Sequence, residues 1–132
     1  MTPVLFIHCT RHEPFVAWIM ARIKQYETRT RNTLKKLLDV WLGERVLIAE
    51  TGSGDPLVRC SAVIDEIVSV TTPEEWERYR QVSYIPFGSN YDWKSGTKVK
   101  YLYHLSDVRP VEPFRLSRSC RRHGRVWAEF YG

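Results

Sequence analysis

The stretch KQYETRTR places charged side chains close enough together to act as one chemical site. Lys24, Glu27, Arg29 and Arg31 follow one another at spacings of three, two and two residues. Residues two apart on a strand face the same side, so Glu27 and Arg29 would share one face, and Lys24 would reach it from a preceding helix. A carboxylate held beside cations stays ionised. The group could therefore bind an anion or a carbonyl, with an acid or base beside it.

The alternative interpretation is that these charges form a solvated helix end and an edge strand. Exposed ion pairs of this kind contribute less than about 1 kcal/mol each. In a functional site, Glu27 would instead be partly buried and paired with Lys24, Arg29 or Arg31, because a lone buried carboxylate is costly. Lys24 would contribute little packing at such a cleft, so its replacement would affect function more than stability.

The hydrophobic pattern changes its period inside this stretch. Apolar side chains at helical spacing predict a helix from Pro14 to Lys24, and alternation predicts a strand from about Tyr26. Further helices are predicted over 32–42 and 72–80, the latter with Thr72 as its cap. Strand patterns occupy 4–9, 44–51, 57–70, 99–105, 108–114 and 125–131. This order predicts one α+β domain over residues 1–132, with five or six mostly antiparallel strands that close as a small barrel.

The order of a helix, K-x-x-E-x-R, a short helix and the strand LGERVLIAET resembles the ASCH (activating signal cointegrator homology) domain of the PUA-like superfamily. Lys24, Glu27 and Arg29 match the first motif, and residues 43–48 match the second. The tail KYLYHLSDVRPVEPF is similar to the closing strand pair of that family. The resemblance covers nearly the whole chain. It implies a PUA-like, partly closed, mostly antiparallel β-barrel of five or six strands with two or three short helices.

Two positions depart from the family pattern. Arg22 stands where the family commonly has glycine, which would let the backbone approach a ligand closely. Members that resemble N4-acetylcytidine amidohydrolases carry a threonine three residues after the lysine, and a later glutamate. Here that position is Glu27, and Thr28 would face the other way on a strand. The lysine, threonine and glutamate set of those enzymes is therefore not reproduced.

The resemblance implies RNA binding or recognition of a modified nucleoside, in a cleft lined by the charged residues above. The alternative is a small hydrolase on the same cleft, which would cleave RNA or act as an amidohydrolase on a modified cytidine. Lys24 and Glu27 would then be catalytic. A protein-interaction module is the third class, because one fold hosts many functions. The sequence does not decide whether Asp65 or Glu66 faces the cleft.

Two further segments could contact RNA. The segment RLSRSCRRHGR is either a solvated loop or a patch for the RNA backbone. Its candidate phosphate-binding residues are Arg118, Arg121, Arg122 and Arg125. The irregular stretch 81–98 contains Tyr91 and Trp93, which could stack on bases or could simply cover the mouth of the barrel.

Composition limits the remaining classes. The formal net charge of +5 favours an anionic partner such as RNA, DNA or a nucleotide. The three cysteines are far apart and form no CxxC motif, so we expect no disulfide framework, no metal site and a reducing, cytoplasmic environment. No signal peptide, membrane span or cofactor-binding motif is visible. We therefore expect no cofactor and no membrane contact, and the sequence indicates no protein partner.

Overall fold

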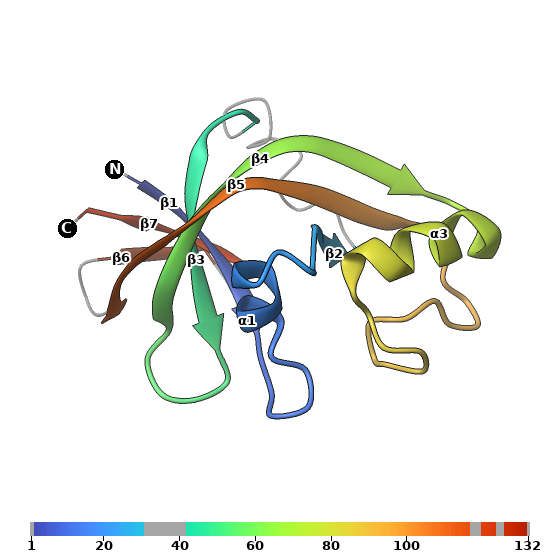
Figure 1. The fold of residues 1–132 in the computed structure, drawn as a ribbon, viewed down its shortest axis with the longest axis horizontal. Coiled ribbons are helices and arrows are strands. Elements are labelled where there is room, and N and C mark those ends of the chain that lie inside the picture. Colours follow the sequence, from blue (N-terminus) through green and yellow to red (C-terminus); the bar gives the residue numbers. More distant parts are fainter. Residues whose placement is uncertain (1, 31–41, 117–119, 124–125, 132) are drawn as a thin grey trace.

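The computed structural model describes residues 2–30, 42–116, 120–123 and 126–131. Its strands form one seven-stranded mixed sheet in the order β2-β5-β4-β3-β1-β7-β6. Neighbouring strands are antiparallel except β1 and β3, which are parallel. The strands are β1 (Thr2–His8), β2 (Tyr26–Arg29), β3 (Arg45–Thr51), β4 (Leu57–Val70), β5 (Lys100–Arg115), β6 (Cys120–His123) and β7 (Trp127–Phe130). Figure 1 shows β4 and β5 crossing the molecule side by side.

The predicted barrel of five or six strands is wrong in strand number and in closure. The ladder ends at β2 and at β6, and within the described residues no backbone pairing joins these edges. The segments 99–105 and 108–114, predicted as two strands, belong to the single strand β5. Register shifts against β4 and a left-handed backbone at Asp107 (φ 46°) let this strand bend without ending. The C-terminal hairpin of β6 and β7 then adds to β1.

The described part of the chain contains two helices, α1 (Phe15–Met20) and α3 (Pro73–Ser83). Helix α3 begins as predicted, with the Thr72 hydroxyl accepting a hydrogen bond from the Glu75 amide at 3.2 Å. The first predicted helix, Pro14 to Lys24, is too long. Arg22 has a left-handed backbone (φ 64°), and the amides of Ile23 and Lys24 both donate to the carbonyl of Trp18. The predicted helix over 32–42 lies outside the described residues.

The conformation of Arg22 gives a physical reason for glycine at this place in the family that the sequence resembles. A positive φ costs glycine nothing, whereas other residues are strained by about 1 kcal/mol or more. The backbone turn that ends α1 thus accounts for a glycine preference without any ligand. Because Arg22 is exposed, its side chain does not occupy the core at this turn.

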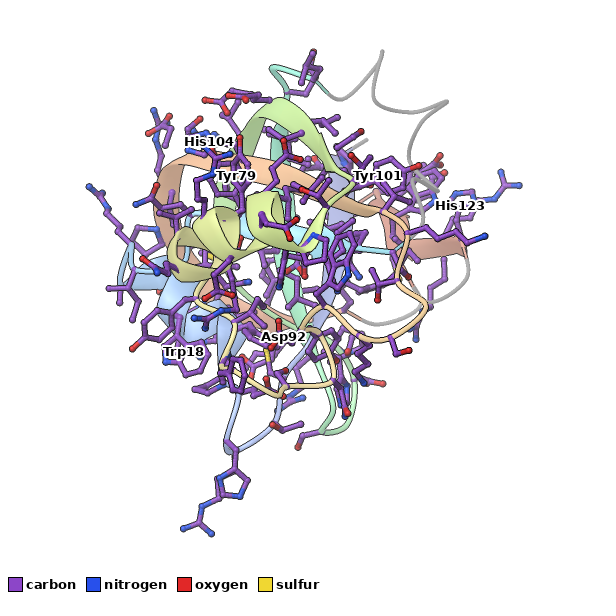
Figure 2. All side chains as sticks on the ribbon, turned by 90° about the vertical axis from the view of Figure 1, so that its right-hand side faces the viewer. Trp18, Tyr79, Asp92, Tyr101, His104 and His123 are labelled. Carbon is purple, nitrogen blue, oxygen red and sulfur yellow. The ribbon has the colours of Figure 1, made fainter. Side chains whose placement is uncertain are left out.

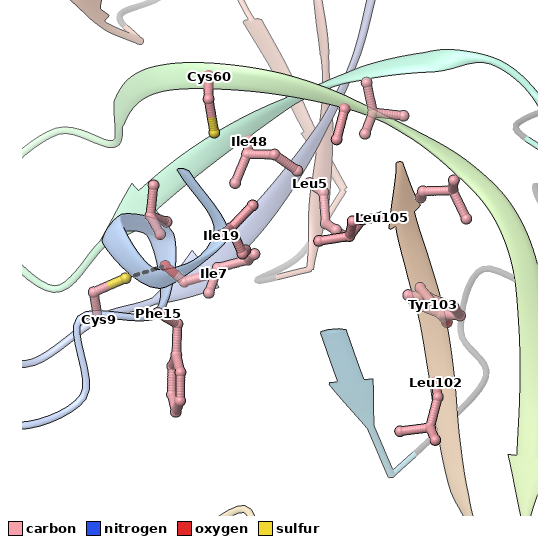
Figure 3. Close-up of a cluster of buried hydrophobic side chains, with 14 of the residues drawn as sticks. Leu5, Ile7, Cys9, Phe15, Ile19, Ile48, Cys60, Leu102, Tyr103 and Leu105 are labelled. Carbon is pink, nitrogen blue, oxygen red and sulfur yellow. Dashed lines mark hydrogen bonds between the residues drawn. The ribbon is translucent and has the colours of Figure 1, made fainter. Parts of the chain in front are cut away.

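Strand β1 is buried on both faces, and its side chains alternate between two hydrophobic clusters. Leu5 and Ile7 lie in the larger cluster with α1, shown in Figure 3. Val4 and Phe6 lie in the smaller cluster, with Ala128 of β7. Burial on both faces explains why this strand reads as an unbroken apolar run.

The sheet curls enough to bring β2 near β1, although three strands separate them in the ladder. The guanidinium of Arg29 on β2 donates from Nη2 to the Phe6 carbonyl on β1 at 2.6 Å. A side chain therefore bridges two strands whose backbones do not pair. The space between these strands is the position of the candidate site.

The loop after α3 is irregular, as predicted, and it is held by specific contacts. The Asp92 carboxylate accepts hydrogen bonds from the Trp76 indole at 2.7 Å and from the Gly88 amide at 2.9 Å. The Lys100 ammonium donates to the Tyr91 carbonyl at 2.6 Å. Tyr91 is fixed against Phe15 of α1, with ring centroids 5.4 Å apart.

Candidate charged site

A cavity of about 50 Å³ lies between β1 and β2. Its walls come from both strands, from α1 and from the loop after α3. The lining residues are Ile7, His8, Phe15, Glu27, Thr28, Arg29, Ile85 and Tyr91. Three of the residues predicted for the site, Glu27, Arg29 and Tyr91, therefore line one cavity. Lys24 does not line this cavity, but it contacts Phe15 of its wall, and we call the cavity together with Lys24 the charged site.

Lys24 is almost fully buried, with 2% of the residue exposed. Its ammonium donates a hydrogen bond to the Ser83 carbonyl at 2.7 Å and lies 4.7 Å from the centroid of the Phe15 ring. Burial lowers the pKa of Lys24; the nearby charge of Glu27 opposes this, and Arg29 adds to it. The expectation that Lys24 contributes little packing is therefore wrong, because the chain turns inward after α1 and buries the whole side chain.

Glu27 is 6% exposed, which is deeper than the partial burial predicted for it. The predicted ion pair is wrong for the described cations: Glu27 approaches neither Lys24 nor Arg29 within 4 Å. Its Oε1 accepts a hydrogen bond from the Thr28 amide at 3.0 Å. Oε2 of Glu27 and Nε of Arg29 are buried without a hydrogen-bond partner among the residues that the structure describes. Arg31 lies outside the described residues.

Unpartnered buried polar atoms are uncommon in folded proteins, because each costs about 1–3 kcal/mol. Here an acceptor, Oε2 of Glu27, and a donor, Nε of Arg29, come from residues on the same face of β2. Both residues line the cavity. The site can therefore bind a small group that donates one hydrogen bond and accepts another.

The size of the cavity limits what can enter it. A water molecule takes about 30 Å³ in the liquid, so about 50 Å³ holds one or two waters or a small polar group. The ring of a nucleobase does not fit in this conformation, but one edge of a base can. Phe15 and Tyr91, with ring centroids 5.4 Å apart, form part of the cavity wall.

Glu13 is an acid near this site that the sequence reasoning missed. Burial lowers the pKa of Lys24, and the negative charge of Glu13 partly offsets this effect. Burial raises the pKa of Tyr91, and the charge of Glu13 raises it further. The Glu13 carboxylate also accepts a hydrogen bond from the Ser89 hydroxyl, which ties the loop after α3 to the segment before α1. In the sequence, Glu13 is simply an acidic residue just before a predicted helix, and no local pattern links it to the charged site.

Other predicted residues lie elsewhere. Trp93 packs against the larger hydrophobic cluster and does not line the charged cavity. Asp65 forms an ion pair with His104 at 2.6 Å, and neither Asp65 nor Glu66 lines the cavity. Arg118 and Arg125 are outside the described residues.

Arg121 and Arg122 are exposed on β6, at the sheet edge opposite β2. Figure 2 shows the neighbouring His123 on the other side of the molecule from Trp18. Phe6 contacts Arg122 of β6 through its ring and Arg29 of β2 through its backbone carbonyl. The Arg122 guanidinium lies 4.7 Å from the centroid of the Phe6 ring, and the Phe6 carbonyl accepts the hydrogen bond from Arg29. The Phe6 ring is buried in the smaller hydrophobic cluster, so Arg122 lies against the face of β1 opposite Ile7, which lines the charged cavity.

Within the described ranges, no group of three or more histidine, cysteine, aspartate or glutamate side chains is arranged to hold a metal ion. Neither described helix is long and apolar enough to cross a membrane.

The burial of Lys24 predicts a dependence of stability on pH. The folded-state pKa lies below the ordinary value of 10.5, so between these two values the unfolded chain binds more protons than the folded chain. The free energy of unfolding therefore receives a contribution from Lys24 that rises with pH in this interval. A Lys24→Met variant should lack that rise. Urea denaturation of both proteins at a series of pH values up to 10.5 measures the difference.

Comparison with the variant is needed because other groups make the free energy of unfolding fall, and not rise, as pH increases. Burial raises the pKa of Cys9 and of Cys60 to about 11, so these thiols favour the folded state less as pH rises above 9.0. Both proteins share that effect, and subtraction removes it. Identical pH slopes in the two proteins would mean that Lys24 titrates as it does in water.

No family model matches this chain, and no curated protein matches its sequence. Solved structures do match its fold. A crystal structure of ASCH from Zymomonas mobilis gives a TM-score of 0.69 at 23% identity, over 87% of this chain and 73% of that one. A Tyr-to-Phe and a Ser-to-Ala variant of the same protein each give 0.68 at 23% identity, over 87% of this chain and 76% and 74% of theirs. The predicted ASCH fold is confirmed.

Proposed function

We propose that the protein binds single-stranded RNA, or a nucleoside within it, by receiving the edge of one base in the charged site. The observation that carries this proposal is the pair of unpartnered buried atoms, Oε2 of Glu27 and Nε of Arg29, at one cavity. An acceptor and a donor from one face of β2 complement a base edge that presents an N–H beside a carbonyl or ring nitrogen. The ASCH fold agrees with this proposal, because the resemblance to that family implied RNA binding.

The charge of the molecule supports the same partner. The formal net charge is +5, and the exposed Arg121 and Arg122 on β6 offer cations to a phosphate backbone outside the charged site. In this proposal the charged site reads a base, while Arg121 and Arg122 hold the backbone without reading sequence.

The test of this division of roles is the salt dependence of RNA binding. Replacing Arg121 and Arg122 with alanine should weaken binding of a single-stranded oligoribonucleotide. It should also reduce the slope of log affinity against log salt by about one for each phosphate that the protein no longer neutralises. Fluorescence anisotropy over a range of salt concentrations measures both quantities. Arg109→Ala is the matched control, because Arg109 is exposed and already paired with Asp107 at 2.8 Å. If the double variant keeps the slope of the unchanged protein, β6 does not contact RNA.

A small hydrolase on the same site is the second candidate function. The observation that favours it is the lowered pKa of Lys24, since burial favours the neutral form of this amine over the charged form. Lys24 would then accept or donate a proton, with Glu27 as the neighbouring acid or base. Incubation of the protein with labelled RNA and with N4-acetylcytidine, followed by separation of the products, distinguishes an enzyme from a binding protein.

A further inference from the structure

A second and larger pocket opens next to the charged site. Its volume is about 560 Å³, within the range of about 300–1,000 Å³ that is typical of pockets for small ligands. The lining residues are His12, Trp18, Arg80, Gln81, Tyr84, Ile85 and Pro86. Ile85 also lines the cavity of the charged site, so the two spaces share a wall residue. We call this space the aromatic pocket.

Two aromatic rings form one corner of the aromatic pocket. Trp18 of α1 and Tyr84 lie edge to face, with ring centroids 4.7 Å apart and planes at 84°. Tyr84 is 44% exposed and has a left-handed backbone (φ 53°) that ends α3. Half-exposed rings fixed at a helix end offer flat apolar surface to a ligand with little loss of conformational entropy.

Arg80 adds a third plane to this pocket. Its Nε and Nη2 donate to the Glu77 carboxylate, and its Nη1 donates to the Ile85 carbonyl at 2.9 Å. These contacts hold the guanidinium and use three of its five N–H donors. The guanidinium lies over the Phe87 ring, 5.9 Å from its centroid, and this flat cation can also stack on a further aromatic ring.

We propose that the aromatic pocket binds one unpaired nucleobase, stacked among Trp18, Tyr84 and Arg80. This inference rests on the proposed function, and it adds a second base subsite next to the charged site. The shared wall at Ile85 would allow neighbouring nucleotides of one strand to occupy the two sites. A base in a duplex is paired and stacked, so it enters such a pocket only after it leaves the helix. The pocket therefore selects single-stranded RNA.

The experiment uses one oligoribonucleotide, either as a single strand or annealed to its complement. Tyr84→Asn removes the ring and tolerates the left-handed backbone, and Trp18→Leu keeps an apolar side chain. Leu42→Asn is the control, because Leu42 is a large apolar side chain that is 50% exposed and lines neither the aromatic pocket nor the charged cavity. Base stacking on an aromatic side chain changes affinity by roughly tenfold or more, so both pocket variants should lose about tenfold for the single strand. Neither should change duplex binding, and the control should bind both RNAs normally.

The outcomes separate this inference from the proposed function. If the unchanged protein binds the single strand and both pocket variants bind it equally well, the aromatic pocket does not take a base, while RNA binding stands. If the variants lose affinity equally for single strand and duplex, the pocket does not select unpaired bases and the inference fails. If the unchanged protein binds neither RNA at low salt, the proposed function fails and the inference fails with it. Melting temperatures of all variants show whether each protein is folded.

Discussion

Replacing Glu27 with glutamine is expected to weaken binding of single-stranded RNA by about ten- to a hundredfold while the fold is kept. The size follows from the loss of one hydrogen bond to a charged group, about 1.5–3 kcal/mol. Glutamine preserves the shape of the side chain and can still accept the hydrogen bond that the Thr28 amide donates to Oε1. The change removes the carboxylate of a cavity-lining residue whose Oε2 is buried without a hydrogen-bond partner among the described residues. Titration calorimetry and a thermal melt measure both effects.

The sign of this effect is informative because general electrostatics predicts the opposite change. Removing one negative charge from a protein that binds RNA should strengthen non-specific attraction to phosphates. Glu112→Gln is the matched control, since Glu112 is exposed on β5 and does not line the charged cavity. We expect this control to bind RNA equally or slightly more tightly. If Glu27→Gln behaves like the control, Glu27 does not recognise a base.

Replacing Gly52 with alanine is expected to lower the free energy of unfolding by about 2–5 kcal/mol. A Cβ atom at Gly52 would lie 2.5 Å from the Cys9 carbonyl oxygen and 3.2 Å from the His8 ring. The first contact is with backbone, which cannot move without loss of the hydrogen bond between the Cys9 amide and the Thr51 carbonyl at 2.9 Å. Chemical denaturation measures the loss.

Gly43 provides the control for this substitution. It also has a left-handed backbone (φ 84°), but a Cβ there would meet no atom within 4 Å. Gly43→Ala should therefore show only the cost of the backbone conformation, about 1–2 kcal/mol. Equal losses at the two positions would mean that the end of β1 adjusts to the new methyl group. His8 lines the charged cavity, so Gly52→Ala should also disturb RNA binding if the variant remains folded.

The local sequence pattern predicted which residues of β2 share a face, and not how deeply they are buried. The change from helical to alternating spacing near Tyr26 is a local signal, so the positions of Glu27 and Arg29 could be predicted from it. The burial of Lys24 depends on the left-handed turn at Arg22 and on the Ser83 carbonyl, 59 residues away in the chain. No local pattern contains that contact.

The open sheet could not be predicted from strand signals for a related reason. Strand patterns show how many strands a sequence can form. Whether the sheet closes into a barrel depends on whether strands that the curled sheet brings together come within backbone hydrogen-bonding distance. Here Arg29 reaches the Phe6 carbonyl with its side chain, and a cavity remains between β1 and β2. Likewise Tyr91 and Trp93 are two residues apart in one loop, yet only Tyr91 lines that cavity.

The claim that RNA enters the charged site is tested most directly by nuclear magnetic resonance of isotope-labelled protein during titration with a single-stranded oligoribonucleotide. The Nε–H group of Arg29 is buried and has no partner among the described residues, so its signal reports on any group that enters the cavity. We expect this signal and the amide signals of Glu27 and Thr28 to shift in a saturable way as RNA is added. Binding of RNA that leaves these signals unchanged, with shifts confined to other surfaces, would contradict the proposed site.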